Sequence, residues 1–305
     1  MKVAITGPTG SVGSDLIRCA LARGDEIIAI VRPGSERLDN LPKSEHLIVL
    51  ECDISNYSSL RNKAHCDVFY HLAWAKTFGT DRDDVHTQVD NIQYCIDAVD
   101  LAESWGASIF VGTGSQAEYG CTQVPLNESI PVNPTSGYGI AKFAAGKLCK
   151  LYCTQKKIRF NWARILSVYG RCDADHTLIR YLINTLLREE IPDLTDCEQI
   201  WDYVYSEDCA KALLAIGDKG VDGRTYCIGS GNPKPLKKYV EILRDAINPN
   251  LNLNFGAKPY YPHQAMFLCA DISDLTADTG FVPEYPFEKG IRKMINGICN
   301  ERGTK

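Results

Sequence analysis

Residues 3–13 read Val3-Ala-Ile-Thr6-Gly7-Pro-Thr-Gly10-Ser-Val-Gly13, an apolar run followed by three glycines spaced three residues apart. The apolar run predicts a buried strand, and the helical pattern of residues 12–23 follows directly, so the glycines lie in a strand-to-helix turn. Glycine permits a tight turn there and lets backbone N–H groups approach a pyrophosphate at the positive end of the helix. The stretch therefore predicts a dinucleotide-binding unit, with a plain glycine-rich turn as the alternative.

Short apolar runs alternate with helical patterns along the rest of the first half. Strands are expected at residues 26–31, 47–51, 67–72, 108–112 and 159–166, and helices at residues 57–64, 84–105 and 136–155. Continuous apolar strands separated by helices are typical of a parallel sheet with both faces covered. We therefore predict an α/β fold, a doubly wound parallel sheet of the Rossmann type.

The second half is less regular and predicts a smaller lobe. Proline- and glycine-rich connections separate helical patterns at residues 177–188, 207–216 and 236–247. We expect residues 1–166, with a returning segment at 201–230, to form the dinucleotide-binding domain. Residues 167–200 and 231–305 are then expected to form an interleaved α/β lobe that binds the substrate.

Charge and composition argue against several classes of partner. The 305 residues carry 33 Lys and Arg against 38 Asp and Glu, and a net charge of −5 does not suit a nucleic-acid or anionic-membrane surface. No run approaches the ~18 apolar residues of a spanning helix, and no spacing is typical of a metal site. The thirteen cysteines are odd in number and include no CxxC pair, which favours free thiols and a cytoplasmic location.

The residues after the second strand bear on the choice of cofactor. An acidic side chain at this place would hydrogen-bond the ribose hydroxyls of NAD, but Val31 is followed by Arg32-Pro-Gly-Ser35-Glu-Arg37. Arg32, helped by Ser35 and Arg37, can pair with a 2′-phosphate through its planar fork. The sequence therefore favours NADP(H), leaves NAD(H) open, and has a solvated surface arginine as its alternative.

Tyr138 and Lys142 stand four residues apart at the start of a predicted helix and so lie on one face. A phenol with a pKa of ~10 is a poor acid or base at neutral pH, but a nearby ammonium and a cationic nicotinamide both favour the phenolate. The preceding strand ends in the hydroxyls of Thr113 and Ser115. Without that context, an ordinary surface pair would be the simpler interpretation of the spacing.

Taken together, the motifs resemble the extended short-chain dehydrogenase/reductases, the nucleotide-sugar epimerase/dehydratase superfamily. The resemblance covers most of residues 1–230. The matching pieces occur in the family's order, and they are Gly7/Gly10/Gly13, Cys52-Asp53-Ile54, His71-Leu-Ala73, Asn91-Ile92, Thr113-Gly-Ser115, Tyr119-Gly120, Pro134-Thr-Ser-Gly-Tyr138, Lys142, Arg164-Ile-Leu-Ser-Val-Tyr-Gly170 and Trp201-Asp-Tyr-Val-Tyr205.

The resemblance implies a role for each matching position. Ser115 would polarise a substrate carbonyl or hydroxyl, Tyr138 would exchange the proton at that oxygen, and Lys142 would hold the ribose and lower the tyrosine pKa. Hydride would pass between the nicotinamide and a sugar carbon, and Asp53 and Ile54 would contact the adenine. The implied cofactor-binding residues are Gly7, Gly10, Ser11, Val12, Gly13, Arg32, Asp53, Ile54, Leu72, Ala73, Asn91, Thr113, Tyr138 and Lys142.

The chain departs from the family pattern in its substrate region. The 4,6-dehydratases carry an Asp-Glu pair after the catalytic hydroxyl residue, and Gln116-Ala117 stands here, which argues against water elimination. Ser167 replaces the usual Asn, and Trp201 replaces an Arg that often grips a diphosphate. Trp201 could instead stack on a base, or one of three arginines could take over, namely Arg171, Arg180 or Arg188. The expected substrate contacts are Gln116, Ser167, Arg171 and Trp201, while Glu118 either reaches the sugar or is solvated.

These residues predict an enzyme, an NAD(P)-dependent oxidoreductase that acts on a nucleotide-activated sugar. The first expectation is reduction of a 4-keto sugar nucleotide with NADPH by a Ser-Tyr-Lys mechanism. The alternatives are an epimerase with a retained NAD and a non-catalytic dinucleotide sensor. The resemblance also implies a homodimer through the helices at residues 84–105 and 136–155.

Overall fold

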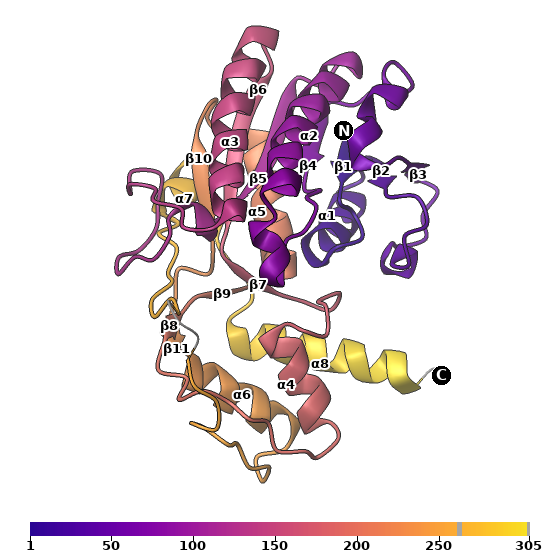
Figure 1. Ribbon diagram of the computed structural model, residues 1–305. Coiled ribbons are helices and arrows are strands. Elements are labelled where there is room, and N and C mark those ends of the chain that lie inside the picture. The colour runs from indigo at the N-terminus through magenta and orange to yellow at the C-terminus, as the bar shows by residue number, and fades with distance from the viewer. Residues whose placement is uncertain (261–263, 304–305) are drawn as a thin grey trace.

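The structure, a computed structural model, describes residues 1–260 and 264–303. Its centre is a seven-stranded parallel sheet in the order β10-β6-β5-β4-β1-β2-β3 (Figure 1). The strands are β1 (Lys2–Thr6), β2 (Glu26–Val31), β3 (Leu47–Glu51), β4 (Val68–His71), β5 (Ile109–Ser115), β6 (Arg159–Ile165) and β10 (Thr225–Ile228). β1 pairs with β2 on one side and β4 on the other, so the strand order reverses beside β1. Ligand crevices of doubly wound sheets lie at this reversal.

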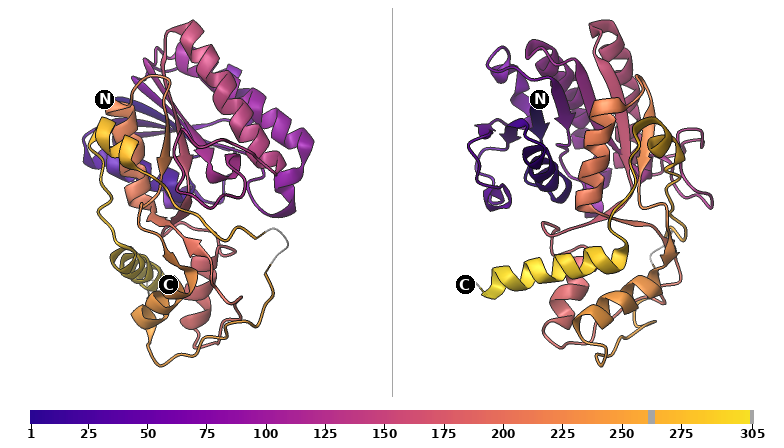
Figure 2. Two further views of the ribbon diagram at one scale, coloured as in Figure 1. Left: turned by 90° about the vertical axis from the view of Figure 1, so that its left-hand side faces the viewer. Right: turned by 180° about the vertical axis from the view of Figure 1, so that it is seen from behind.

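Helices cover both faces of the sheet, as its apolar strands require (Figures 1 and 2). One face carries α1 (Ser11–Ala22), α5 (Ser206–Lys219) and α7 (Ser273–Thr279), and the other carries α2 (Val85–Ser104) and α3 (Gly137–Lys156). Each layer has its own core, with Leu16 and Leu213 on the α1 side and Phe69 and Phe110 on the α2 side. The predicted doubly wound parallel sheet is confirmed.

A smaller lobe lies beyond the carboxyl ends of the strands (Figure 1). Its helices are α4 (Leu178–Leu186), α6 (Leu236–Ile247) and α8 (Phe287–Gly303), and its short strands pair as β7 (Ser167–Tyr169) with β9 (Tyr203–Tyr205) and β8 (Ile200–Trp201) with β11 (Lys234–Pro235). Aromatic rings fill its core. The Phe287 ring packs on Tyr169, Tyr203 and Tyr239 at centroid distances between 4.6 and 6.0 Å.

The structure differs from the sequence prediction chiefly where tertiary contacts determine the bounds or the type of an element. β5 extends beyond the expected range of residues 108–112 and ends at the Ser115 hydroxyl, as the run of hydroxyl residues indicated, because its last residues pair with Ala163 and its neighbours on β6. The expected helix at residues 57–64 is a 3-10 turn, η2 (Ile54–Leu60). Sequence periodicity did not predict β10, α7 or α8, and α7 packs on α5 and β10 rather than on the lobe.

No helix within the two described ranges has the length and apolar character that a bilayer crossing needs. None of the thirteen cysteines forms a disulfide within the described part of the chain, and most of them are buried. Burial raises the pKa of Cys153 to about 12, so this thiol stays protonated near neutral pH. The buried cysteines therefore behave as small apolar residues, in keeping with the sequence prediction.

Candidate active site

The turn between β1 and α1 forms the floor of the site. Gly7 has a φ of 66°, which favours glycine, and a β-carbon there would lie 2.9 Å from the Ala73 amide nitrogen. A β-carbon on Gly13 would overlap the Gly7 carbonyl oxygen. α1 begins after Gly10 with no side-chain cap and no acidic residue in its first turn, so its first N–H groups remain available. The turn can therefore accept an anionic group such as a pyrophosphate.

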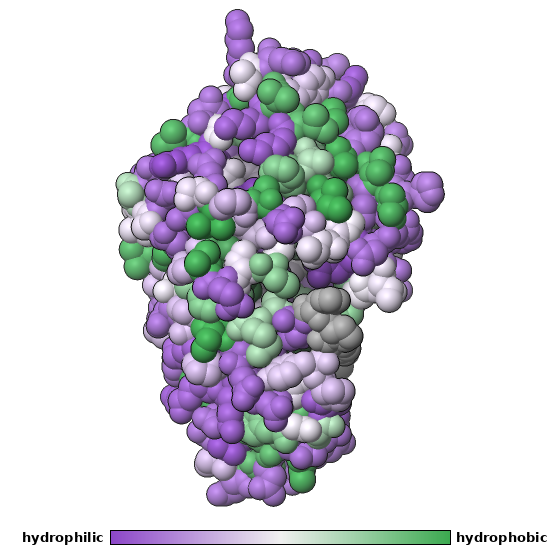
Figure 3. Space-filling view, turned by 60° about the vertical axis from the view of Figure 1, so that its left-hand side comes forward, coloured by the Kyte–Doolittle hydropathy of each residue, from purple (hydrophilic) through white to green (hydrophobic). Residues whose placement is uncertain are grey.

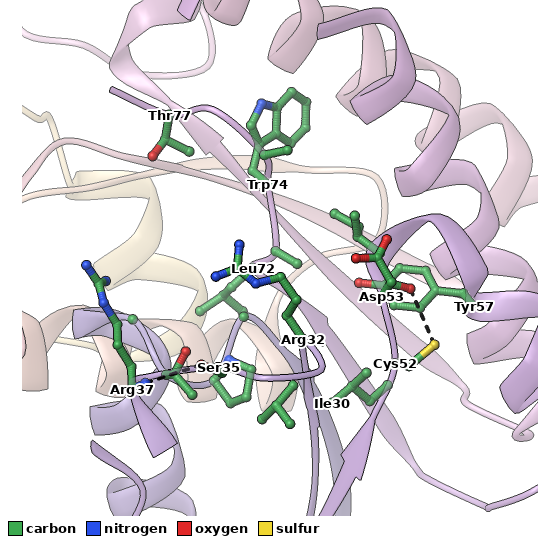
Figure 4. Close-up of a pocket in the computed structure, with 18 of the residues that line it drawn as sticks. Ile30, Arg32, Ser35, Arg37, Cys52, Asp53, Tyr57, Leu72, Trp74 and Thr77 are labelled. Atoms are coloured by element: carbon green, nitrogen blue, oxygen red, sulfur yellow. Dashed lines mark hydrogen bonds between the residues drawn. The ribbon is translucent and has the colours of Figure 1, made fainter. Parts of the chain in front are cut away.

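A cavity of about 620 Å³ opens from this turn along the ends of the neighbouring strands (Figure 4). Half of the predicted cofactor residues line it, namely Gly7, Gly10, Arg32, Asp53, Ile54, Leu72 and Ala73. Arg32 lies between Arg37 and Asp53 in Figure 4, and Ser35 and Glu36 of the same loop also line this end. Hydrogen bonds from Ser55, together with the charge of Arg32, lower the pKa of Asp53.

The loop that follows β4 closes the other end of the cavity. Trp74 lines the cavity, and its Nε1 donates to the Gln88 side chain 2.9 Å away. Asn91, expected to line the cofactor site, lies behind it: its side-chain amide binds the Ala75 backbone at 2.9 and 3.0 Å. Thr113 is also outside the lining, and its hydroxyl donates to the His71 carbonyl at 3.1 Å. Both residues therefore hold the walls of the site in place. The remaining predicted cofactor residues outside the lining are Ser11, Val12, Gly13, Tyr138 and Lys142.

Ser115 and Tyr138 meet at the end of β5. Ser115 caps the 3-10 turn η4 (Gln116–Glu118), and Tyr138 stands in the first turn of α3, which Ser136 caps. The Ser115 hydroxyl donates to the Gln116 side-chain oxygen 2.6 Å away, and it lies close enough to Tyr138 to lower the pKa of the phenol. Burial raises the pKa of Tyr138, while the Ser115 hydrogen bond and the charge of Arg82 lower it. The structure thus brings the two predicted reacting hydroxyls together.

Lys142 lies one turn further along α3 and is buried. Its Nζ donates to the Thr113 carbonyl 2.7 Å away, and it lies 3.8 Å from the Trp74 ring centroid and 5.8 Å from that of Tyr138. Burial lowers the pKa of Lys142 to about 8, against the opposing charges of nearby groups. A carbonyl and an aromatic face stabilise the ammonium. Its charge therefore acts on whatever occupies the site and on the phenol.

A buried ion pair supports the Ser115 end of the site. One Glu118 oxygen accepts from Arg164 Nε at 2.7 Å, and the other accepts from the Ser115 amide at 2.9 Å and from Trp162 Nε1 at 3.0 Å. Arg164 also donates to the Tyr119 hydroxyl at 2.8 Å. Glu118 is fully buried, so the two roles that the sequence offered, a sugar contact and a solvated loop residue, are both wrong. It fixes the Ser115 backbone.

Besides Gln116, the sequence predicts that Ser167, Arg171 and Trp201 contact the substrate. These three side chains do not all lie together in the structure. The Trp201 Nε1 donates to the Ser167 hydroxyl at 2.7 Å, so two departures from the family pattern contact each other across β8 and β7. Arg171 is directed elsewhere, because its stem packs on α8 and its charge acts on Asp15. The structure therefore brings Trp201 and Ser167 into contact and directs Arg171 away from them; a role in substrate binding stays a prediction.

The other two arginines considered for a diphosphate contact have acidic partners. Arg180 Nε lies 3.3 Å from Asp175, and an Arg188 guanidinium nitrogen lies 2.7 Å from Glu190. A diphosphate would have to compete with these carboxylates for either guanidinium.

Two residues that the sequence analysis did not single out complete the surroundings of Tyr138. The Trp74 ring meets the Tyr138 ring edge to face at 5.9 Å, and the Arg82 guanidinium lies 4.7 Å from the Tyr138 ring centroid. Trp74 directly follows the His71-Leu-Ala73 motif, and this position could have marked it as a residue of the site. Nothing in the sequence marks Arg82.

The model of the NAD dependent epimerase/dehydratase family matches residues 3–229. The chain belongs to this family. A CDP-abequose synthase of Salmonella muenchen is 25% identical over 97% of each chain, and an uncharacterised UDP-glucose epimerase of Bacillus subtilis is 26% identical over 85% of this chain and 86% of its own. The crystal structure of a UDP-glucose 4-epimerase of Thermotoga maritima, 18% identical, has a TM-score of 0.89 and covers 99% of this chain and 100% of that one.

Membership in the NAD-dependent epimerase/dehydratase family confirms the predicted resemblance, and with it the class of enzyme. The residues present also fit a dinucleotide. A β-carbon on Gly7 or Gly13 would obstruct the turn, α1 has free N–H groups, and the adjoining cavity extends from Gly10 to Arg37. The β1–α1 turn and the adjoining cavity therefore form a site that fits the dinucleotide of this family.

The buried pair gives a test of how the site is held. Glu118→Gln and Arg164→Met should each lower the free energy of unfolding by about 3–5 kcal/mol, because each leaves the other charge buried and unpaired. The double variant should lose less than the sum of the two. Urea unfolding followed by circular dichroism measures all three. Arg188→Met, which breaks an exposed pair, is the control and should change stability by less than about 1 kcal/mol; additive losses in the double variant would contradict this account.

Proposed function

We propose that the chain reduces a 4-keto sugar nucleotide with NADPH. The observation that carries the proposal is the grouping of Ser115, Tyr138 and Lys142 at the end of β5, beside a cavity that fits a dinucleotide. Similarity to a CDP-abequose synthase along nearly the whole of both chains supports a nucleotide-activated sugar as the substrate class. Retention of all three polar groups argues against a non-catalytic sensor.

Tyr138 stands where it can give a proton to a reacting oxygen. The bound dinucleotide supplies the hydride that reduces the carbonyl carbon. Tyr138 transfers its phenolic proton to the carbonyl oxygen, and Ser115 donates a hydrogen bond to the same oxygen. Ser115 must first leave the Gln116 oxygen to which it donates, so substrate entry exchanges one hydrogen bond for another. The Lys142 ammonium lowers the cost of the phenolate that remains.

Gln116 and Ala117 restrict the chemistry at the sugar. Elimination of water needs a positioned acid or base, and neither an amide nor a methyl group supplies one. Simple reduction is therefore favoured. An epimerase with a retained NAD is the second candidate, because the UDP-glucose epimerase of Bacillus subtilis is similar over most of both chains.

The arginines after β2 support NADPH over NADH. Arg32, Ser35 and Arg37 line the end of the cavity that also contains Asp53. No carboxylate follows Val31 directly, and a 2′-phosphate would gain charge-assisted hydrogen bonds from the guanidinium groups. An enzyme that retains NAD would be expected to carry an acidic residue after Val31 to bind the ribose hydroxyls. Because this residue is missing, we rank the reductase above the epimerase.

Arg32→Ala tests the cofactor choice. The variant should bind NADPH about 10–100-fold more weakly and NADH within about twofold of the parent, because a hydrogen bond between charged groups contributes 1.5–3 kcal/mol. Fluorescence titration with each reduced dinucleotide measures both affinities. Arg61→Ala, which removes an exposed partner of Asp100, is the control. Equal loss for the two dinucleotides, or a parent protein that prefers NADH, would contradict the assignment.

Turnover with a 4-keto-6-deoxy sugar nucleotide tests the reaction. The protein should consume NADPH, and Tyr138→Phe should lower kcat by about 10²–10⁴-fold because the proton donor is lost. Tyr152→Phe on the same helix, whose hydroxyl binds Asp100, is the matched control. Interconversion of two sugar nucleotides without net NADPH consumption would favour the epimerase. Unchanged turnover in Tyr138→Phe would refute the role of the phenol.

We also propose a homodimer through the outer faces of α2 and α3. Apolar side chains are exposed there, namely Val85, Val89, Ile140, Leu148 and Leu151. Val85 and Leu151 are 65% and 63% exposed, and Figure 3 shows apolar side chains gathered over these two helices. A gathered apolar surface of this kind is typical of an interaction site, and one face pairs with its own copy about a twofold axis.

The double variant Val89→Glu, Leu151→Glu should be a monomer at concentrations where the parent is a dimer, because two buried charges would face their own copies. Sedimentation velocity measures the change. Val282→Glu, at an exposed valine outside both helices, should remain dimeric. A monomeric parent protein at the same concentration would exclude the proposed interface.

A cytoplasmic location stays a prediction. The free thiols support it, because reducing compartments keep cysteines unpaired.

A further inference from the structure

The β4–α2 loop, residues 72–84, lies against the start of α3. The Asp83 carboxylate accepts a 2.7 Å hydrogen bond from the Gly137 amide, the first N–H group of the helix. A β-carbon on Gly137 would lie 3.1 Å from the Arg82 carbonyl oxygen, so the loop and the helix backbone are almost in contact. The loop is therefore fixed next to Tyr138.

The side chain of Arg82 extends from this loop over the ring of Tyr138. Its guanidinium carbon lies 4.7 Å from the ring centroid, within the range of a cation–π contact. Its Nε atom is buried and has no hydrogen-bond partner. Among the residues that the structure describes, no carboxylate pairs with Arg82. The charge is therefore not neutralised locally and acts on the phenol.

We propose that Arg82 is a positioning residue for Tyr138, which holds the ring beneath a cation and stabilises the phenolate that proton transfer leaves behind. The inference rests on the proposed function in one respect, that Tyr138 exchanges a proton with the substrate. It adds a fourth residue to Ser115, Tyr138 and Lys142. Arg82 acts through the phenol and needs no contact with the substrate.

The groups that face Tyr138 act on its pKa in opposite directions. Burial raises the pKa, and the Ser115 hydrogen bond and the Arg82 charge lower it. The Glu118 charge raises the pKa but is paired with Arg164, and the Asp83 carboxylate is engaged at the start of α3. The positive charge of Arg82 thus mainly offsets the free-energy cost of burying a phenolate at Tyr138.

Lys142 and Arg82, the two cations near the phenol, lose their charge at different pH values. Burial lowers the pKa of Lys142 to about 8, so the cofactor-free protein loses this charge in mildly alkaline solution. An arginine remains charged at any pH at which the protein is folded. The phenolate therefore depends increasingly on Arg82 at alkaline pH.

A titration of Tyr138 tests the proposal without a sugar substrate. Protein labelled with ¹³C at the tyrosine ζ-carbon is saturated with whichever of NADP⁺ and NAD⁺ it binds, because the nicotinamide cation brings the phenol pKa into reach. Tyr138→Phe identifies the resonance. In R82Q and in R82M the midpoint should rise by about 1 pH unit, and in R82K it should stay within ~0.3 units of the parent, because lysine keeps the charge.

Lys147→Gln is the matched control. Lys147 lies 5.5 Å from the Phe143 ring on the same helix, so its loss removes a cation–π contact that does not involve Tyr138. Its midpoint should equal that of the parent. An unchanged midpoint in both R82Q and R82M would overturn the proposal, and so would a shift in R82K as large as in R82Q.

Kinetics give an independent readout that a merely structural role would not move. During reduction Tyr138 must carry its proton, so kcat falls as the pH rises through its pKa. R82Q should therefore move the alkaline limb of kcat to higher pH by the same amount as the titration, with the KM for NADPH unchanged. A lower kcat with an unmoved limb would overturn the proposal. The turnover of Tyr138→Phe decides the proposed function separately.

Discussion

At the β1–α1 turn, Gly13 lies so close to the Gly7 carbonyl that no side chain fits between them. This contact brings the start of α1 against the end of β1, at the point where the strand order reverses. The loop after β4 passes over the same turn, with the Ala73 amide against Gly7. The crevice, its free N–H groups and the wall that faces them all follow from this one close approach.

The side chains proposed to react depend on a second support at the end of β5. Glu118 binds the Ser115 amide and is held in turn by Arg164, so a buried ion pair supports the backbone of Ser115. Tyr138 approaches from the first turn of α3, which is fixed from the other side by Asp83. The backbone at Ser115 and the backbone that carries Tyr138 are thus each anchored by a carboxylate, and such anchoring suits the directed proton transfer of the proposed function.

Patterns that repeat locally could be predicted from the sequence. The glycine spacing around Gly7 predicted the strand-to-helix turn, and the four-residue separation of Tyr138 and Lys142 placed both side chains on one helical face. Glu118 was misassigned because its burial depends on Arg164, a partner 46 residues away. Arg82 was missed because only the conformation of the β4–α2 loop brings it to the phenol. Pairings between distant segments leave no periodic trace in the chain.

Five parts of the site come from the ends of five different strands, and Tyr138 and Lys142 come from α3. Gly7 follows β1, Arg32 follows β2, Asp53 follows β3, Trp74 follows β4, and Ser115 ends β5. Of these five residues, Trp74 packs against the hydrophobic layer on the α2 side, and the other four lie outside both hydrophobic layers. In terms of the proposed function, the cofactor preference assigned to the segment after β2 and the sugar preference assigned to the end of β5 can change in separate steps, each in a folded protein.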